Sequence, residues 1–332
     1  MIDKPKPKLL DEMREQLQTR HYARSTTDTY VMWAKRFILF NGKRHPREMG
    51  QGEVEAWLTN LAVNEQVSAS TQNQALAGVL FLYRDVLKMD IGNVDAVRAR
   101  RGKKIPAVFS VDEVWRVLAA MQGQPRLAAM LMYGGGLRLM EAMSLRVKDI
   151  DFDQRTIAVH DGKGDKDRIT LLPMALVEQM SKQIEVVKAN MAVDVARGFG
   201  GATMPEALSR KYVNASRELG WQYVLPADHL IRSLDGKSMV RHHLHESVVQ
   251  KAVRAAVRQA GVNKQAGCHT FRHSFATHAL QNGMDIRTLQ ELMGHNDVRT
   301  TMGYLHVMVN AGTGDRSPLD ALSVMRTQVY KY

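Results

Sequence analysis

The stretch that decides the fold runs from 267 to 304 and reads GCHTFRHSFATHALQNGMDIRTLQELMGHNDVRTTMGY. His269 and Arg272 are three residues apart, so on a helix they share one face. His295 follows Gly294 at a predicted turn, and Tyr304 comes nine positions later on another predicted helix. Each residue alone has an ordinary explanation, such as a surface charge, a turn or a core tyrosine. Together with polar residues upstream they predict a chemical site.

Two upstream cations complete this set. Arg138 follows the triple glycine 134–136 at the start of a predicted helix, and Lys163 stands at the tip of a β-hairpin predicted over 156–172. Two arginines can hold the non-bridging oxygens of a phosphodiester with bidentate hydrogen bonds. A lysine can protonate the leaving oxygen, a histidine can accept a proton, and a tyrosine can be the covalent nucleophile. The set predicts phosphoryl transfer without a metal.

The first part of the chain predicts a small helical domain. Apolar residues recur at helical spacing in four segments, namely 8–20, from Ser25 through Phe37, 54–63 and 76–87. We expect the Ser25 side chain to cap the second of these helices. This domain is predicted to span 1–97.

A basic linker over 98–107 separates it from a second domain over 108–332. The linker cations are expected to lie near DNA phosphates: Arg98, Arg100, Arg101, Lys103 and Lys104. The second domain opens with a capping box formed by Ser110 and Glu113, and a helix is predicted from Pro125 to Tyr133. The glycine- and proline-containing stretch 198–245 reads as an irregular insertion on a helical scaffold.

Composition narrows the class of partner. The chain of 332 residues carries 46 Lys+Arg against 34 Asp+Glu, a net charge of +12, which favours a polyanion such as DNA or RNA. One cysteine excludes an intramolecular disulfide and a multi-cysteine zinc site, and it fits a reducing cytoplasm. No segment approaches the roughly 20 consecutive apolar residues of a membrane span. We expect no membrane association and a cytoplasmic protein.

The motifs now carry a resemblance to a known family. Gly136-Leu-Arg138, Gly162-Lys-Gly-Asp-Lys166, His269-Thr-Phe-Arg272-His273, Leu292-Met-Gly-His295 and the context of Tyr304 resemble the tyrosine recombinase (phage integrase) family in order and separation. The resemblance covers 110–310, and the helical first domain looks like that family's core-binding, SAM-like domain. It implies a mainly α-helical, two-domain C-shaped DNA clamp with a small β-hairpin in the catalytic domain.

The resemblance also implies roles and an assembly. Arg138 and Arg272 would bind the scissile phosphate, Lys163 would protonate the leaving 5′ oxygen, and His269 would act in acid/base transfer. His295 would bind phosphate or orient groups, and Tyr304 would form a 3′-phosphotyrosyl bond. Lys166, also a candidate DNA contact, is the rival of Lys163. The family implies a homo-tetramer on two DNA sites, with a segment after Leu305 exchanged between neighbours, and a bacterial host.

Within that family the insertion is similar to the extra region of integron integrases, which recombine gene-cassette sites folded from single-stranded DNA. Bases that bulge from such hairpins need stacking surfaces and partners for their edges. The candidate residues are Trp221, Tyr223, Pro226, His242 and His243. For Trp221 and Tyr223 the alternative is a small satellite core.

Other classes of protein compete with this interpretation. His242, His243 and His245 cluster, and His269 and His273 are spaced i, i+4, but no catalytic glutamate follows and an arginine separates the second pair, so a metal site is disfavoured. No Walker-type loop indicates ATP, and no cofactor is expected. The compact two-domain length and the insertion argue against a type IB topoisomerase, which uses similar chemistry. A Xer-like recombinase of duplex sites and a non-catalytic DNA-binding protein remain alternatives, although simple DNA binding does not need the tyrosine and arginine set.

Overall fold

The computed structural model describes residues 8–99, 106–160, 167–199, 201–212, 214–233, 236, 238–295, 297–302 and 304. The chain divides into two compact units, Met1–Ile105 and Pro106–Tyr332. The C-shaped DNA clamp expected from the two domains remains a prediction. No helix among the described residues is long and apolar enough to cross a membrane.

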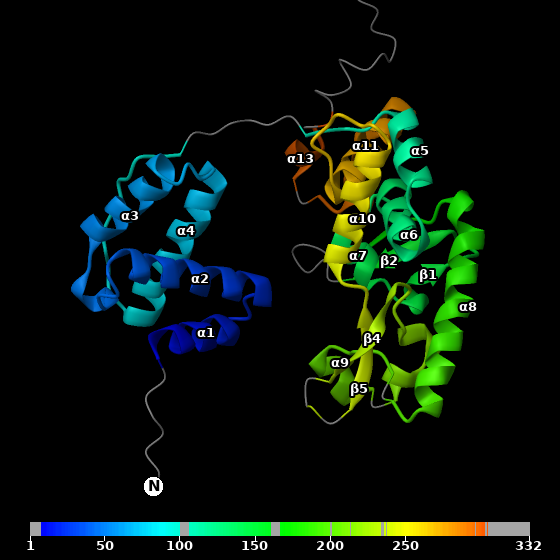
Figure 1. Ribbon diagram of the computed structural model, residues 1–332, viewed down its shortest axis with the longest axis horizontal. Helices are drawn as coiled ribbons and strands as arrows, with labels where there is room; N and C mark the ends of the chain where they lie inside the picture. Colours follow the sequence, from blue (N-terminus) through cyan, green and yellow to red (C-terminus); the bar gives the residue numbers. More distant parts are fainter. Residues whose placement is uncertain are drawn as a thin grey trace, which may run out of the picture. The chain divides into compact units, whose positions relative to one another are not determined.

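The first unit is helical, as the periodicity predicts (Figure 1). Its elements are α1 (Leu9–Thr19), α2 (Arg24–Phe40), η1 (Pro46–Glu48), α3 (Gln51–Val63), α4 (Ala69–Phe81) and the π-helical η2 (Leu82–Leu87). Trp57 packs edge-on against Phe37 in the core, with ring centroids 5.4 Å apart. The predicted cap is wrong: α2 begins before Ser25, and Ala23 at its N-cap makes no side-chain hydrogen bond.

The second unit is a helical body with two small antiparallel sheets (Figure 1). In chain order its elements are α5 (Val111–Ala119), α6 (Gly123–Gly134), α7 (Leu139–Ser144), η3 (Val147–Asp149), β1 (Ile150–Asp151), β2 (Thr156–Val159), β3 (Arg168–Leu171), α8 (Met174–Ala196), α9 (Glu206–Lys211), η4 (Ala215–Arg217), η5 (Leu219–Trp221), β4 (Pro226–Arg232), β5 (Met239–His243), α10 (Glu246–Gln259), α11 (Cys268–Gln281), α12 (Ile286–Met293) and α13 (Val298–Met302).

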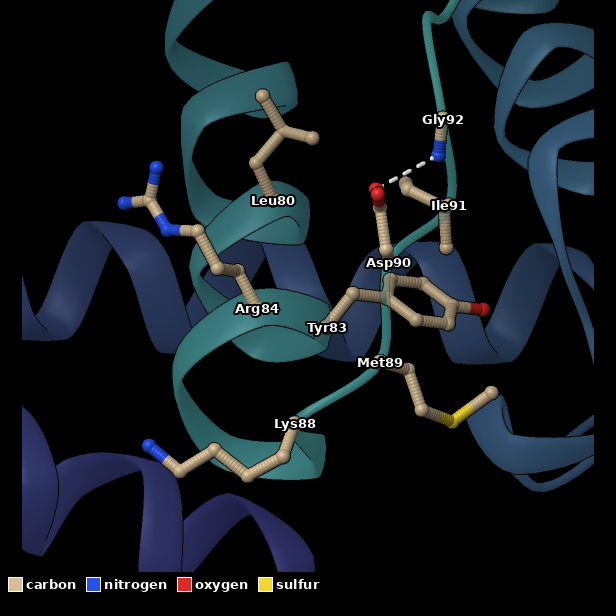
Figure 2. Close-up of a pocket in the computed structure, with 8 residues that line it drawn as sticks. All are labelled: Leu80, Tyr83, Arg84, Lys88, Met89, Asp90, Ile91 and Gly92. Atoms are coloured by element: carbon tan, nitrogen blue, oxygen red, sulfur yellow. Dashed lines mark hydrogen bonds between the residues drawn. The ribbon is translucent and has the colours of Figure 1, made fainter.

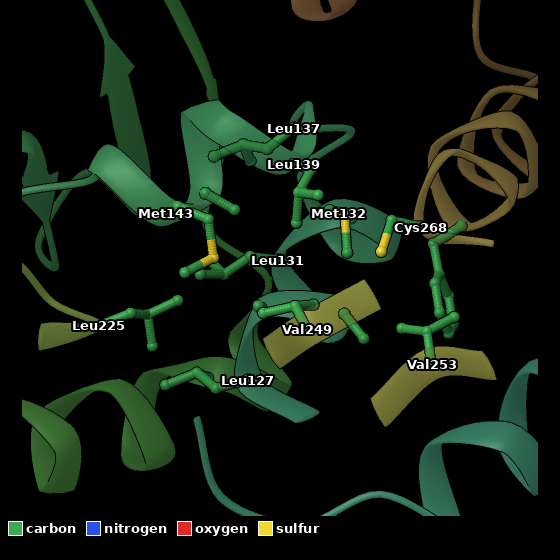
Figure 3. Close-up of a cluster of buried hydrophobic side chains, with 14 of the residues drawn as sticks. Leu127, Leu131, Met132, Leu137, Leu139, Met143, Leu225, Val249, Val253 and Cys268 are labelled. Atoms are coloured by element: carbon green, nitrogen blue, oxygen red, sulfur yellow. The ribbon is translucent and has the colours of Figure 1, made fainter. Parts of the chain in front are cut away.

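The capping box is confirmed at the start of α5. The Ser110 side chain accepts a hydrogen bond from the backbone of Glu113 at 3.1 Å, and the Glu113 carboxylate accepts one from the backbone of Ser110 at 2.7 Å. The core behind it joins helices far apart in sequence. Figure 3 shows side chains from α6, α7, α10 and α11 meeting there, including Leu131, Val249 and Cys268.

The predicted β-hairpin is confirmed, and β1 joins it as a third strand. Ile157 pairs with Thr170 and Val159 with Arg168, and these four residues form the inner face. Ile169 on β3 lies on the outer face, with 64% of its surface exposed. The inner face of β3 is therefore polar, and this brings Arg168 toward α7 and α12.

The insertion is more regular than the sequence predicts. It contains the antiparallel pair β4–β5, with Ile231 opposite Val240 and an irregularity between Pro226 and Leu230. Arg241 on β5 fixes this pair to α8, because its guanidinium donates to both carboxylate oxygens of Asp194 at 2.6 and 2.7 Å. Figure 1 shows β4, β5 and α9 at one end of the second unit, with α11 and α13 at the other.

Candidate active site

A glycine turn places Arg138 at the start of α7. Gly136 has φ +64°, and a Cβ there would fall 2.5 Å from the Phe275 ring, so glycine alone lets the turn approach α11 so closely. The carbonyl of Gly135 accepts a hydrogen bond from Thr170 at 2.7 Å. The turn is held between α11 and β3, which brings Arg138 against both elements.

Glu141 joins two arginines beneath this turn. Its carboxylate accepts from Arg138 Nη1 at 2.6 Å and from Arg168 Nη1 and Nη2 at 2.9 and 2.6 Å. Burial alone would raise the pKa of Glu141, but the hydrogen bonds from Arg168 and the Arg138 backbone hold it at about 2. Glu141 is therefore ionised at neutral pH and fixes both guanidiniums. Neither Glu141 nor Arg168 was predicted from the sequence as a site residue.

Arg272 lies buried behind Arg138. Its guanidinium donates to the backbone carbonyls of Gly136 and Met293, the latter at 2.5 Å, and its Nη1 lies 3.8 Å from the Glu141 carboxylate. Burial, and then the charge of Arg138, lowers the pKa of Arg272 to about 10, so it remains charged at neutral pH. Three guanidiniums against one carboxylate leave two positive charges in this cluster, which suits it to an anion.

His295 connects the arginine cluster to Tyr304. Its Nε2 lies 3.2 Å from Arg272 Nη2 and must accept, since a guanidinium only donates. Its Nδ1 then carries the proton and donates to Thr301 Oγ1 at 2.9 Å. Burial and the neighbouring Arg272 lower the pKa of His295 to about 4. The neutral ring lies nearly parallel to that of Tyr304, with centroids 6.2 Å apart.

Tyr304 is buried, with 6% of its surface exposed, and packs in an apolar cluster with Phe275 and Met293. Its hydroxyl is 2.9 Å from Nδ1 of His273, a residue that sequence reasoning quoted in a motif but did not assign to the site. Burial raises the pKa of Tyr304, although Arg272 and Arg138 lower it in part. The phenol is protonated at rest.

His269 occupies the exposed side of the same cluster. Its ring centroid is 6.4 Å from that of His273, one helical turn along α11. Partial burial, followed by the charges of Arg272 and Arg138, lowers the pKa of His269. The His269 side chain is therefore exposed to solvent and close enough to both arginines for their charges to act on it.

The structure therefore brings together five of the six residues predicted as catalytic: Arg138, His269, Arg272, His295 and Tyr304. Lys163 and Lys166 lie outside the described residues, on the connection between β2 and β3. Arg100, Arg101, Lys103 and Lys104 also lie outside them, and Arg98 is exposed. Among described residues, no group of three His, Cys, Asp or Glu is placed to hold a metal ion.

The insertion residues form a separate cluster around Arg146. This buried guanidinium donates to the carbonyls of Trp221 and Thr203 and to the hydroxyl of Tyr223, and it lies 4.2 Å from the Tyr223 ring centroid. The Trp221 ring is partly exposed, with the Lys148 ammonium 4.6 Å from its centroid. The cluster thus combines an aromatic face with cations.

Two histidines extend this cluster on β5. The rings of His242 and His243 lie 3.9 Å apart, and His242 Nδ1 is 2.7 Å from Thr203 Oγ1. Burial, His243 and Arg146 lower the pKa of His242 to about 4. Tyr223 is 7% exposed and Pro226 is buried, so neither offers an open face to a base. Tyr223 instead packs edge-on against His242 and His243, and only Trp221, His242 and His243 remain as candidate base contacts.

A hollow of about 550 Å³ in the first unit lies apart from these residues. Its lining includes Tyr83, Lys88 and Asp90 (Figure 2). The Tyr83 hydroxyl is buried without a hydrogen-bond partner among the described residues, and burial raises its pKa to about 12. None of the described residues predicted to be catalytic lines this hollow; they lie in the second unit.

Comparison with known proteins places this geometry in a family. The Phage integrase family matches residues 107–310, and its N-terminal SAM-like domain matches residues 9–93. An Escherichia coli protein called "Integrase/recombinase" is 45% identical, covering 97% of this chain and 96% of its own. Tyrosine recombinase XerD of Agrobacterium fabrum is 32% identical, covering 77% and 76%. The chain belongs to the phage integrase family of tyrosine recombinases, enzymes that cleave and rejoin DNA.

Solved structures show the same fold. A lambda integrase dimer bound to a COC′ core site has a TM-score of 0.61 at 18% identity, covering 89% of this chain and 93% of that one. XerH bound to a palindromic difH substrate has a TM-score of 0.56 at 19% identity, covering 95% and 85%. A small-sheet helical catalytic domain following a helical N-terminal domain is thus confirmed as the fold class.

Proposed function

We propose that this chain is a site-specific recombinase of the integron-integrase type, which integrates and excises gene cassettes and accepts sites folded from single-stranded DNA. The observation that supports it most is the separation of two clusters in one unit. Arg138, Arg272 and Tyr304 form a strand-transfer site, and Trp221 with the histidines of β5 forms a separate aromatic, cationic surface. In Figure 1, β5 is drawn at the opposite end of the unit from α11 and α13. A recombinase of plain duplex sites needs only the first.

Each residue of the first cluster has a role in this proposal. Arg138 and Arg272 hold the non-bridging oxygens of the scissile phosphate, and Glu141 with Arg168 keeps the Arg138 guanidinium in place. Tyr304 Oη attacks phosphorus, forms the 3′-phosphotyrosyl bond and displaces the 5′ oxygen, which Lys163 protonates. The phosphotyrosyl ester conserves the energy of the broken phosphodiester bond. A second 5′ hydroxyl can therefore rejoin the strand without ATP.

The insertion cluster would recognise extruded bases. An unpaired base can stack on the partly exposed Trp221 ring while Lys148 beside it meets the adjoining phosphate. The paired rings of His242 and His243 offer a second flat surface and ring nitrogens for base edges. Arg146 and Arg241 hold this surface to the helical body.

The working assembly in this proposal is a homo-tetramer on two DNA sites in the bacterial cytoplasm. A solved lambda integrase tetramer bound to a Holliday junction has a TM-score of 0.61 with this chain at 16% identity, covering 89% of this chain and 76% of that one. Recombination joins two duplexes with two cleavages each, which requires four tyrosines. The basic residues of the linker, from Arg98 to Lys104, would contact DNA phosphates.

The direct experiment offers the purified protein labelled DNA sites in two forms, fully paired and folded from one strand. A denaturing gel then reveals covalent protein–DNA adducts. Adducts on both forms support the proposal, and adducts on duplex sites alone support the alternative of a Xer-like recombinase. Binding without any adduct on a broad panel of sites would favour a non-catalytic DNA-binding protein.

Chemical rescue separates the two hairpin lysines. A 5′-bridging sulfur gives a leaving group that needs no proton, so this substrate should restore cleavage to Lys163→Ala if Lys163 is the general acid. The Lys166→Ala variant serves as the matched control, since it removes the same charge three residues away. Rates of adduct formation on oxygen and sulfur substrates provide the measurement. Rescue of Lys166→Ala alone would transfer the role to Lys166.

Removing the aromatic surface of the insertion, formed by Trp221, His242 and His243, should weaken binding to folded single-stranded sites more than binding to fully paired sites. Base–aromatic stacking contributes about 1–3 kcal/mol per base, so Trp221→Ala should weaken hairpin binding by roughly ten- to a hundred-fold. Binding to a paired site should hardly change, because phosphate contacts dominate it. The measurement is a titration of both DNAs at one salt concentration, because charge contributions vary steeply with salt.

Trp115→Ala is the matched control for this titration, since Trp115 is 70% exposed on α5 and lies outside the insertion. His242→Ala with His243→Ala tests the second surface in the same way. Equal losses on hairpin and duplex DNA would mean that the insertion is structural. The protein would then be a generic tyrosine recombinase.

A further inference from the structure

The hydrogen-bond partner of the Tyr304 hydroxyl is His273, at 2.9 Å from Nδ1. His269, the histidine predicted for acid/base transfer, lies one turn earlier on α11 and on the exposed side of the site. His273 is only partly exposed, and its ring packs against that of Tyr304 with centroids 5.6 Å apart. The geometry therefore separates the two histidines by function.

We propose that His273 is the general base that takes the proton of the Tyr304 hydroxyl, whereas His269 serves the phosphate. This inference rests on the proposed role of Tyr304 as the nucleophile. A phenol is the better donor and an imidazole nitrogen the better acceptor, so the hydroxyl donates to Nδ1. The proton that must leave during attack already points at its acceptor, within the distance that proton transfer requires.

The charges around His273 make its basicity depend on DNA. Burial, then His269 and Arg272, lowers the pKa of His273 to about 4, so the free ring is neutral and can accept. The titratable and charged groups that face it are His269 and Arg272 on the same helix, His295 from the end of α12, and Tyr304. A phosphate bound at the arginines offsets their charge and raises the basicity of His273.

Two proton transfers accompany strand cleavage in this proposal, one to a base and one from an acid. The proton moves from Tyr304 Oη to His273 Nδ1 as the Oη–phosphorus bond forms. The bond from phosphorus to the 5′ oxygen breaks, and that oxygen takes a proton from the hairpin lysine. On rejoining, the 5′ hydroxyl attacks, the lysine recovers a proton, and His273 returns its own to the departing tyrosine oxygen.

The variant His273→Asn tests whether His273 is the general base. The asparagine amide oxygen can lie near the Nδ1 position and accept the hydrogen bond, but it cannot take the proton. His273→Asn should slow single-turnover adduct formation by about 100- to 10,000-fold, with DNA affinity near wild type. The sulfur substrate should not rescue this variant, since the defect is in attack and not in departure. Added imidazole should partly restore cleavage to His273→Ala.

The pH profile supplies a readout that a purely structural role would not change. The wild-type rate should fall as pH drops through the pKa of His273 in the DNA complex, because protonated His273 cannot accept. The His273→Asn rate should instead keep rising toward high pH as tyrosinate forms.

His278→Asn is the matched control. His278 lies on the same helix, and its Nδ1 is 2.9 Å from the hydroxyl of Tyr133, so it forms the same kind of pair outside the arginine cluster. It should cleave at the wild-type rate. Wild-type cleavage by His273→Asn, or imidazole rescue of His269→Ala instead of His273→Ala, would overturn the proposal. An unreactive wild-type protein would count against the proposed function itself.

Discussion

Tyr304→Phe should form no covalent adduct with DNA on any site that the wild-type protein cleaves, while its DNA affinity stays close to wild type. The change removes one oxygen atom, the proposed nucleophile. The ring keeps its place beside His295 and within the apolar cluster of Phe275 and Met293. Losing the hydrogen bond to His273 should cost about 1 kcal/mol of unfolding free energy, too little to unfold the unit. Denaturing gels and binding titrations on the same DNA give the two measurements.

Tyr133→Phe is the matched control for this variant. Tyr133 is partly buried, and its hydroxyl is 2.9 Å from His278 Nδ1. The control loses an equivalent tyrosine–histidine hydrogen bond and should cleave normally. A stable adduct formed by Tyr304→Phe would assign the nucleophile to another residue, and loss of DNA binding would show that the hydroxyl is needed for folding or docking.

Helices of the fold could be predicted because burial imposes a period on the sequence. The apolar stripe through Leu76 and Val79 marks α4, and Ser110 with Glu113 marks the start of α5. The π-helical segment Leu82–Leu87 that continues α4 leaves the apolar pattern nearly unchanged, so the sequence did not reveal it. The cap expected at Ser25 failed because the helix begins earlier.

The strands show where apolar patterns mislead. On β3, Ile169 is exposed, whereas Arg168 and Thr170 face inward, where they bond Glu141 and the Gly135 carbonyl. A search for apolar alternation directs attention to the wrong face of the strand and misses Arg168. The β4–β5 pair was read as irregular because its anchor is polar: Arg241 and Asp194 join segments 47 positions apart.

Site residues that belong to motifs of fixed spacing could be predicted from the sequence. Residues that hold those side chains in place were missed. Arg138, Arg272, His295 and Tyr304 were expected together, and the structure places them together. Three residues were missed, namely Glu141, Arg168 and His273. Arg168 and His273 act on those side chains through contacts that no sequence spacing encodes. An acidic residue three positions after a helix-starting arginine was the available signal for Glu141, since it can cap the helix and pair with the arginine at once.

Arg138→Ala and Arg272→Ala change the two arginines that we propose to hold the scissile phosphate. Both variants should slow the same reaction step, but they should differ in their effect on folding. Removing either donor to the charge that grows in the transition state should cost about 2–4 kcal/mol of activation free energy, roughly 30- to 1,000-fold in single-turnover cleavage. Site affinity should change much less. In Arg138→Ala, Glu141 keeps two hydrogen bonds from Arg168, so the fold should hold.

Arg272→Ala should lose stability as well, because it leaves the carbonyls of Gly136 and Met293 without their buried donor. Each unsatisfied buried group costs about 1–3 kcal/mol, which urea denaturation can measure. Arg272→Lys keeps the charge but not the planar fork, and should recover stability better than rate.

Arg241→Ala should lower stability without changing the cleavage rate, since it breaks a buried ion pair between β5 and α8, outside the arginine and tyrosine cluster. It should lower the urea midpoint yet cleave paired sites at the wild-type rate under folded conditions. If Arg138→Ala and Arg272→Ala also cleave at that rate, the two guanidiniums do not hold the scissile phosphate. The positive cluster around Glu141 would then serve only to join α7, β3 and α11, and the transition-state charge would have to be stabilised by cations outside it.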